Sequence, residues 1–144
     1  MAIGIAMLLA ACAAKPLPPA ELAKLQGGTT KLVVYAECAP INRLTGLRLA
    51  GARYVVRVKG KVIARLRSCM SKRVSVPSGS HPISVAHQSG SLFGPQSRDG
   101  IFRPGATQYL FVYRSGSANV FHRWGTAAHA KQIIANGKSV KQFW

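Results

Sequence analysis

Alternation of apolar and charged residues between positions 52 and 67 is the feature that most constrains how this chain can fold. The stretch reads ARYVVRVKGKVIARLR and divides at Gly60 into two halves. One set of alternate positions is apolar, namely Tyr54, Val56 and Val58 before the turn and Val62, Ala64 and Leu66 after it. The other set contains most of the charge, namely Arg53, Val55, Arg57, Lys61, Ile63, Arg65 and Arg67. A period of two with one charged face predicts an antiparallel hairpin with one side on a core and one in water.

Similar strand patterns recur at short intervals along the chain. We expect strands over residues 31–36, 73–76, 81–88, 107–114 and 120–124. The Gly- and Ser-rich segment 89–100 is expected to form a loop, and a helix capped by Thr126 is expected over 127–135, ending at Asn136-Gly137. Short strands separated by turn signals predict a β-sandwich. The predicted fold class is therefore mainly β, an antiparallel β-sandwich with a short C-terminal helix.

Two motifs connect these elements with a known family. Pro77, Gly79 and His81 form one turn motif, and a strand motif follows at Gly105, Thr107, Tyr109 and Phe111. Together with the order of elements over about residues 31–135, these motifs resemble a family of bacterial lipoproteins of unknown function with a transthyretin-like or PEGA-like β-sandwich. The resemblance implies a folded module held on a membrane, and it brings no catalytic residues with it.

The N-terminal segment supports the same interpretation. An apolar run from Ala2 to Ala11 ends directly at Cys12. It is too short to span a bilayer, which needs roughly 20 apolar residues, but it has the length of a signal-peptide core. The four residues Leu9 to Cys12 resemble the bacterial lipobox, which implies cleavage before Cys12 and a lipid on its thiol. A non-lipidated export signal and an ordinary N-terminal helix are the alternatives.

The same resemblance predicts the domain organisation and the location. Residues 1–11 form a lipoprotein signal peptide, 12–30 a Pro/Gly-rich tether, and 31–144 the β-sandwich domain. The residue after Cys12 is Ala13 and not Asp. By the family's sorting rule, this implies a lipid-anchored protein at the periplasmic face of the outer membrane.

Lipidation of Cys12 would leave Cys38 and Cys69 as the remaining cysteines of the chain. Because the periplasm is oxidising, we expect these two thiols to form a disulfide bond. Two buried free thiols are the alternative. A metal pair is disfavoured, since neither cysteine has a second ligand at the usual short spacing.

The charge of the chain points to polyanions as partners. It has 20 Lys and Arg against three acidic residues, a formal net charge of +17. In the envelope the available polyanions are lipopolysaccharide, anionic lipid and cell-wall polymers, and a protein partner also stays open. A basic surface without a binding role is the plainer interpretation. The candidate anion-binding residues cluster around the hairpin and are Lys59, Lys61, Arg65, Arg67, Lys72 and Arg73.

Enzymatic functions find little support in the sequence. A glycosidase needs two carboxylates at one bond, and the chain offers only Glu21, Glu37 and Asp99. No P-loop or GxGxxG motif is present, and no nucleophile-elbow sequence surrounds a serine. The four histidines lack helical i, i+4 spacing, so we expect no metal site and no cofactor. The expected function is a non-enzymatic binding or scaffolding module for anionic envelope components or a protein partner.

The alternative function is binding of nucleic acid, for example in DNA transfer or uptake. Tyr109, Phe111 and Tyr113 alternate along one expected strand and could offer a platform on which bases stack. Aromatic residues in this arrangement more often belong to a core.

Overall fold

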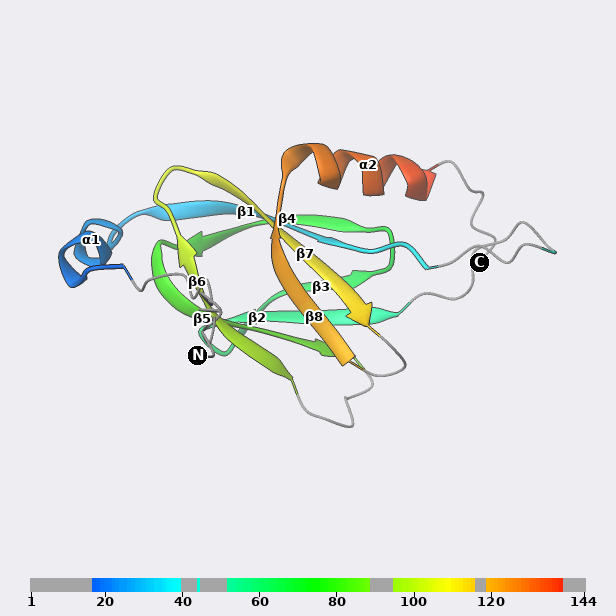
Figure 1. Cartoon of the computed structure of the whole chain (residues 1–144), viewed down its shortest axis with the longest axis horizontal. Helices are drawn as coiled ribbons and strands as arrows, with labels where there is room; N and C mark the ends of the chain where they lie inside the picture. The colour runs from blue at the N-terminus through cyan, green and yellow to red at the C-terminus, as the bar shows by residue number, and fades with distance from the viewer. Residues whose placement is uncertain (1–16, 40–43, 45–51, 89–94, 116–118, 139–144) are drawn as a thin grey trace, which may run out of the picture.

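Two β-sheets packed face to face form the body of the protein (Figure 1). The computed structural model describes residues 17–39, 44, 52–88, 95–115 and 119–138; the predicted signal peptide and Cys12 lie outside this part. In chain order the elements are α1 (Pro19–Lys24), β1 (Thr29–Ala36), β2 (Arg53–Val58), β3 (Lys61–Arg67), β4 (Ser71–Pro77), β5 (Gly79–His87), β6 (Gln96–Phe102), β7 (Thr107–Ser115), β8 (Asn119–Gly125) and α2 (Ala127–Lys138).

Each sheet contains four strands. The β1 sheet has the order β4-β1-β7-β8, and the β2 sheet has the order β3-β2-β5-β6. These two layers and the C-terminal helix confirm the predicted β-sandwich. One pair departs from the antiparallel pattern, because β1 and β7 run parallel. These strands are far apart in the chain and meet without a hairpin, so no tight turn imposes an antiparallel arrangement on them.

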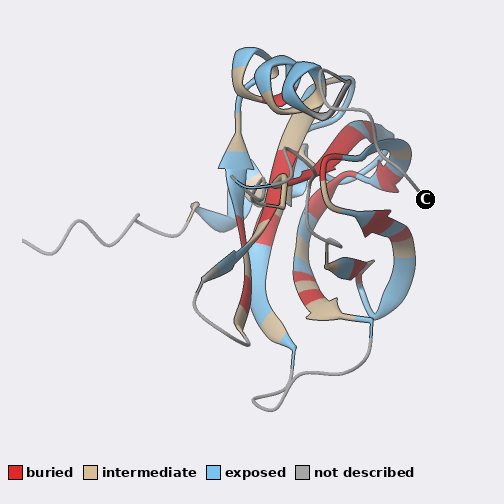
Figure 2. Cartoon of the chain, turned by 90° about the vertical axis from the view of Figure 1, so that its right-hand side faces the viewer, coloured by how far each residue is buried: buried red, intermediate tan, exposed pale blue. Residues whose placement is uncertain are grey.

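The main core lies between the two sheets and consists of the inward positions of the strands. Tyr54, Val56 and Val58 of β2 are buried there, as the alternation of the sequence predicts. Figure 2 shows buried and exposed positions following one another along the strands of both layers. From the other strands the core receives Leu32, Val34, Ala36, Ala64, Leu66, Val76, Ile83, Val85, Phe102, Leu110, Val112 and Val120.

The hairpin departs from strict alternation at one β-bulge. The register of β2 and β3 shifts between Val56 and Arg57, so that Val56 pairs with Ala64 and Arg57 with Val62. The extra residue is Ile63, which packs against the core. Val62, which the alternation predicts to face inward, is therefore 36% exposed.

Two further predictions of the sequence need correction. The segment predicted as a loop over 89–100 contains the start of a strand, since β6 begins at Gln96 and pairs with β5 along its length. The C-terminal helix continues through Asn136-Gly137 to Lys138. Glycine costs only about 1 kcal/mol inside a helix, which is too little to end one by itself. The Thr126 cap is confirmed, because its hydroxyl accepts the backbone N–H of His129 at 3.2 Å.

A second, smaller core lies between the outer face of the β1 sheet and α2. Tyr35 is fully buried there, with Phe111 of the neighbouring strand and Ala130 of the helix. The Tyr35 hydroxyl forms a hydrogen bond of 2.8 Å with Nδ1 of His129. This hydroxyl lies so close to the backbone at Gly125 that a Cβ there would overlap it. Glycine at 125 is therefore needed for the tyrosine to reach the helix.

A cluster of hydrogen-bonded, buried polar groups connects the two sheets at one end. The hydroxyl of Thr30, which is fully buried, donates to the carbonyl oxygen of Arg103 at 2.7 Å and lies 3.1 Å from the Ser78 hydroxyl. His81 Nε2 lies 3.0 Å from the carbonyl oxygen of Ser78. Because a carbonyl only accepts, His81 donates here, and its ring stacks on Phe102 with 6.0 Å between centroids. The Pro77-Gly79-His81 motif therefore has a structural role in this fold.

At the opposite end of β1, a disulfide bond joins Cys38 to Cys69, as the sequence predicts. The backbone N–H of Cys69 also donates to the carbonyl oxygen of Glu37 at 2.9 Å. The Glu37 carboxylate accepts the backbone N–H of Arg114 at 2.6 Å and the Tyr54 hydroxyl at 3.4 Å. Burial, followed by the nearby Glu37 carboxylate, raises the pKa of Tyr54 to about 12. The bridge therefore connects β1 to the β3–β4 turn beside a buried phenol.

Removal of this bridge should destabilise the protein without changing its fold. The bond closes a loop with a sequence separation of 31. The double substitution Cys38→Ser/Cys69→Ser should lower the free energy of unfolding by about 3–4 kcal/mol, which urea denaturation monitored by circular dichroism measures. A reducing agent should lower the wild-type value by a similar amount and leave the double variant unchanged. Equal stability of the oxidised wild type and the variant would contradict a structural bond.

Candidate anion-binding surface

The tip of the β2–β3 hairpin is a tight, basic turn. Lys59 and Gly60 both have positive φ angles, 52° and 74°. Two successive residues of positive φ are typical of the two-residue turns whose twist matches antiparallel strands. Glycine accepts this conformation freely, whereas Lys59 is an unusual choice. The turn places Lys59 and Lys61 on either side of Gly60, and both side chains are exposed.

Four arginines lie on the outer face of the strands that leave this turn. Because Tyr54 and Val56 point into the core, Arg53 and Arg57 of β2 point away from it. On β3, Arg65 and Arg67 alternate with the buried Leu66 and likewise face outward. Arg53, Arg65 and Arg67 are exposed and Arg57 is half-buried. We call Arg53, Arg57, Arg65 and Arg67 the arginine face.

Two arginines of the arginine face lie directly opposite one another on neighbouring strands. Arg53 and Arg67 are direct cross-strand partners in the register of β2 and β3. The two strands, RYVVRV and KVIARLR, contribute four arginines and no carboxylate. The arginine face therefore concentrates positive charge on two adjacent strands.

The structure divides the six predicted anion-binding residues between the two sheets. Lys59 and Lys61 lie at the hairpin tip, and Arg65 and Arg67 belong to the arginine face. Lys72 and Arg73 lie on β4, at the edge of the β1 sheet. Arg73 pairs with Val33, whose neighbours Leu32 and Val34 point into the main core, so Arg73 faces outward from the opposite layer.

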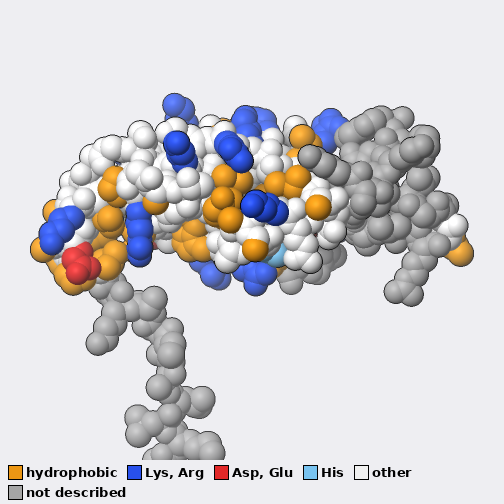
Figure 3. Space-filling view, turned by 90° about the horizontal axis from the view of Figure 1, so that it is seen from above, with side chains coloured by type: hydrophobic (Ala, Val, Ile, Leu, Met, Phe, Trp, Pro, Cys, Tyr) orange, Lys and Arg blue, Asp and Glu red, His pale blue; other side chains and the backbone are white. Residues whose placement is uncertain are grey.

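Two residues of the arginine face, Arg53 and Arg57, were absent from the predicted set. The signal that identifies them is the alternation with Tyr54 and Val56, which places them on the same side as Arg65 and Arg67 once the strands pair. Basic residues also occur on other surfaces. Figure 3 shows Lys and Arg side chains spread over the face that carries α2, with acidic atoms only near the end formed by α1.

The aromatic stripe of β7 does not form an open platform. Phe111 is buried beneath α2, and Tyr109 and Tyr113 pack beside it, so the stripe belongs to the smaller core. The Arg123 guanidinium carbon lies 5.4 Å from the centroid of the Phe111 ring and 5.7 Å from that of Tyr113. The Phe111 ring thus already contacts His129 of the helix, and Arg123 lies over the rings of both Phe111 and Tyr113.

The histidines are dispersed over the fold and serve separate contacts. His81 binds a turn carbonyl, His129 binds Tyr35, and the ring of His87 meets Tyr54 edge-on at 6.5 Å. Nδ1 of His122 is buried without a hydrogen-bond partner. Within the described part of the chain, no three His, Cys, Asp or Glu residues lie close enough together to hold a metal ion.

Comparisons with known proteins leave the function to be argued from these features. No protein-family model matches the chain, and no curated protein matches it significantly. Across the residues that the structure describes, no helix has the length and hydrophobicity needed to cross a bilayer.

The buried His122 makes stability depend on pH in a predictable direction. Burial, and then the nearby Arg98 charge, lower the pKa of His122 below its ordinary value of 6.5. Because the folded state binds this proton less well than the unfolded state, His122 reduces stability as the pH falls below about 6.5. Urea denaturation at about pH 7.5 and about pH 5.5 should show a smaller loss of stability in His122→Leu than in the wild type. An identical loss in both proteins would contradict a buried, neutral His122.

Proposed function

We propose that this protein is a lipid-anchored lipoprotein of the outer membrane that binds anionic envelope components through its arginine face. The observation that carries the proposal is the gathering of Arg53, Arg57, Arg65 and Arg67 on one face of two paired strands. A phosphate bound between neighbouring guanidinium groups would be held by paired, charge-assisted hydrogen bonds.

The type of cation favours phosphate as the group that is bound. Arginine offers a planar fork of donors that matches two oxygens of one phosphate, and it remains charged at every physiological pH. Four such groups project from two adjacent strands of a rigid sheet, with Lys59 and Lys61 at one end. The phosphates of lipopolysaccharide and of anionic lipids are closely spaced at a membrane surface and suit a flat array of this kind.

The location rests on two further observations. Leu9 to Cys12 resemble a lipobox, which provides the site of the anchor. The Cys38–Cys69 disulfide supports a location outside the reducing cytoplasm. A lipid at Cys12 would hold the sandwich near the membrane surface, where a basic sheet face meets anionic headgroups. No step of this role requires catalysis.

Nucleic-acid binding remains the second candidate, because the same arginines would also accept a phosphodiester backbone. Proteins that bind single-stranded nucleic acid without sequence preference combine a basic groove with aromatic rings on which bases stack. Here Phe111 is buried beneath α2, and Arg123 lies over the rings of Phe111 and Tyr113. This occupancy favours the envelope partner over the nucleic acid.

Neutralising the arginine face should weaken binding of lipopolysaccharide. The triple variant Arg53→Gln/Arg65→Gln/Arg67→Gln, in neutral detergent, should bind fluorescent lipopolysaccharide about 100-fold more weakly than the wild type. The estimate follows from about 1 kcal/mol for each basic residue at an anionic surface. Fluorescence anisotropy measures the affinities, with duplex DNA titrated in parallel over a salt series.

A matched control separates this face from net charge alone. Lys31, Lys72 and Arg73 are exposed residues of the β1 sheet, and changing all three to Gln removes the same charge from the other layer. This control variant should retain affinity within about tenfold of the wild type. Equal losses in the two triple variants would refute a specific face. Tighter binding of DNA than of lipopolysaccharide, with a steep dependence on salt, would favour the nucleic-acid alternative.

The proposed anchor has its own test. Cells expressing the protein should incorporate a clickable palmitate analogue into it, and Cys12→Ser should abolish the label. Cys38→Ser provides the control, because a cysteine inside the folded domain should not affect lipidation. Label that persists in Cys12→Ser would place the lipid elsewhere, and absence of label in the wild type would remove the anchor.

A further inference from the structure

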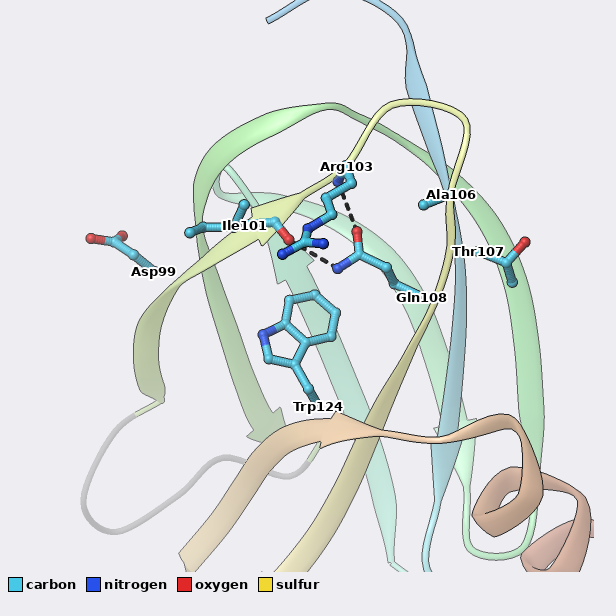
Figure 4. Close-up of a pocket in the computed structure, with 7 residues that line it drawn as sticks. All are labelled: Asp99, Ile101, Arg103, Ala106, Thr107, Gln108 and Trp124. Carbon is cyan, nitrogen blue, oxygen red and sulfur yellow. Dashed lines mark hydrogen bonds between the residues drawn. The ribbon is translucent and has the colours of Figure 1, made fainter. Parts of the chain in front are cut away.

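A pocket of about 530 Å³ lies at the end of the sandwich where β6 connects to β7. Its lining includes Arg103, Gln108 and Trp124, which come from the β6–β7 connection, β7 and β8. Figure 4 shows the Arg103 guanidinium, the Gln108 amide and the Trp124 ring converging on one another, whereas the Asp99 and Thr107 side chains point outward at the rim. This pocket has no part in the arginine face.

The backbone of Arg103 is held in place from two directions. Its N–H donates to Oε1 of Gln108 at 2.8 Å, and Nε2 of the same amide donates to the carbonyl oxygen of Ile101 at 2.9 Å. The carbonyl oxygen of Arg103 accepts the buried hydroxyl of Thr30 at 2.7 Å. The chain is thus fixed on both sides of the Cα atom, while the guanidinium remains exposed. The fixed backbone keeps the base of the Arg103 side chain beside the pocket, so less entropy is lost when the guanidinium binds an anion than if this segment of the chain were also free.

The Trp124 ring is also positioned by its neighbours, although it is 42% exposed. It meets the buried Phe102 edge-on with 5.6 Å between ring centroids. At Gly100 of β6, a Cβ atom would overlap the Ile83 side chain and lie 3.2 Å from Cζ2 of Trp124. The absence of a side chain at Gly100 therefore makes room first for Ile83 and also for the edge of the indole. The remaining exposed surface of the ring lines the pocket.

These groups have complementary preferences for a ligand. An indole face is apolar and electron-rich, so it attracts the weakly positive C–H groups of a saturated ring. A guanidinium forms paired, charge-assisted hydrogen bonds with a carboxylate. The Asp99 and Thr107 side chains point outward at the rim, so the indole and the guanidinium are the groups that face a ligand (Figure 4). A pyranose that carries a carboxylate offers a partner for both in one molecule.

We propose that this pocket binds an acidic sugar, with the pyranose ring against Trp124 and its carboxylate on Arg103. The site is independent of the arginine face, which lies on β2 and β3 and takes no part in lining the pocket. Binding of a soluble acidic saccharide can therefore succeed or fail irrespective of the binding of lipopolysaccharide phosphates.

The test uses a disaccharide of glucuronic acid and N-acetylglucosamine, together with its carboxyl methyl ester as the matched neutral ligand. In the full chain carrying Trp144→Phe, the remaining indole is Trp124, so fluorescence reports this pocket. The acid should change the emission in a saturable way and bind about tenfold more tightly than the ester, because the ester removes the charged partner of Arg103.

Substitutions then assign the two contacts. Arg103→Gln should remove the preference for the acid over the ester, whereas Arg98→Gln, an exposed arginine of β6 outside the pocket lining, should retain it. Trp124→Phe keeps an aromatic ring against Phe102, and by calorimetry it should weaken the binding of both sugars to a similar extent. The arginine-face triple variant should bind the disaccharide like the wild type.

Three results would overturn the proposal. One is an absence of saturable change in Trp124 emission with the acidic disaccharide. Another is an equal loss of affinity in Arg103→Gln and Arg98→Gln, which would indicate attraction to net charge and not a pocket. The third is unchanged affinity for both sugars in Trp124→Phe, which would remove the indole from the site.

Discussion

The packing of one apolar face of each sheet against the other determines on which face of the described strands the charged side chains lie. Once Tyr54, Val56 and Leu66 are committed to the core, the arginines that alternate with them have only the outer face available. The chain contains 20 basic residues, so this constraint places many charged side chains on the outer faces of the two sheets. The smaller core beneath α2 covers part of the outer face of the β1 sheet, whereas Arg53, Arg65 and Arg67 remain exposed on the other layer.

How far the sequence predicts the fold depends on whether burial or pairing dictates each element. The β2–β3 hairpin is readable because both of its strands bury alternate residues in the core. The sequence does not predict β6, since QSRDGIF is rich in polar residues and glycine. This strand is ordered by its backbone pairing with β5 at the edge of the sheet. The bulge at Ile63 is likewise a matter of register, which alternation alone does not reveal.

The candidate sites show a similar division. Lys59 to Arg73 are neighbours in the sequence, yet the core separates β3 from β4 into different sheets. The predicted set therefore combined residues from two layers and omitted Arg53 and Arg57, which pairing brings to the same face. The pocket was beyond prediction, because Arg103, Gln108 and Trp124 meet only after β6, β7 and β8 have taken their places in opposite sheets.

The position of β1 has a consequence for how the molecule can be assembled. This first strand is an interior strand of its sheet, between β4 and β7, and its Tyr35 contacts the last helix through His129. A chain that emerges from a ribosome or a translocation pore with its N-terminus first would hold β1 without its β7 partner until residues 107–115 follow. Tyr35 would lack its hydrogen bond to His129 for longer still, until α2 has also emerged. Completion of the β1 sheet and of the smaller core is thereby delayed until the C-terminal part of the chain is available.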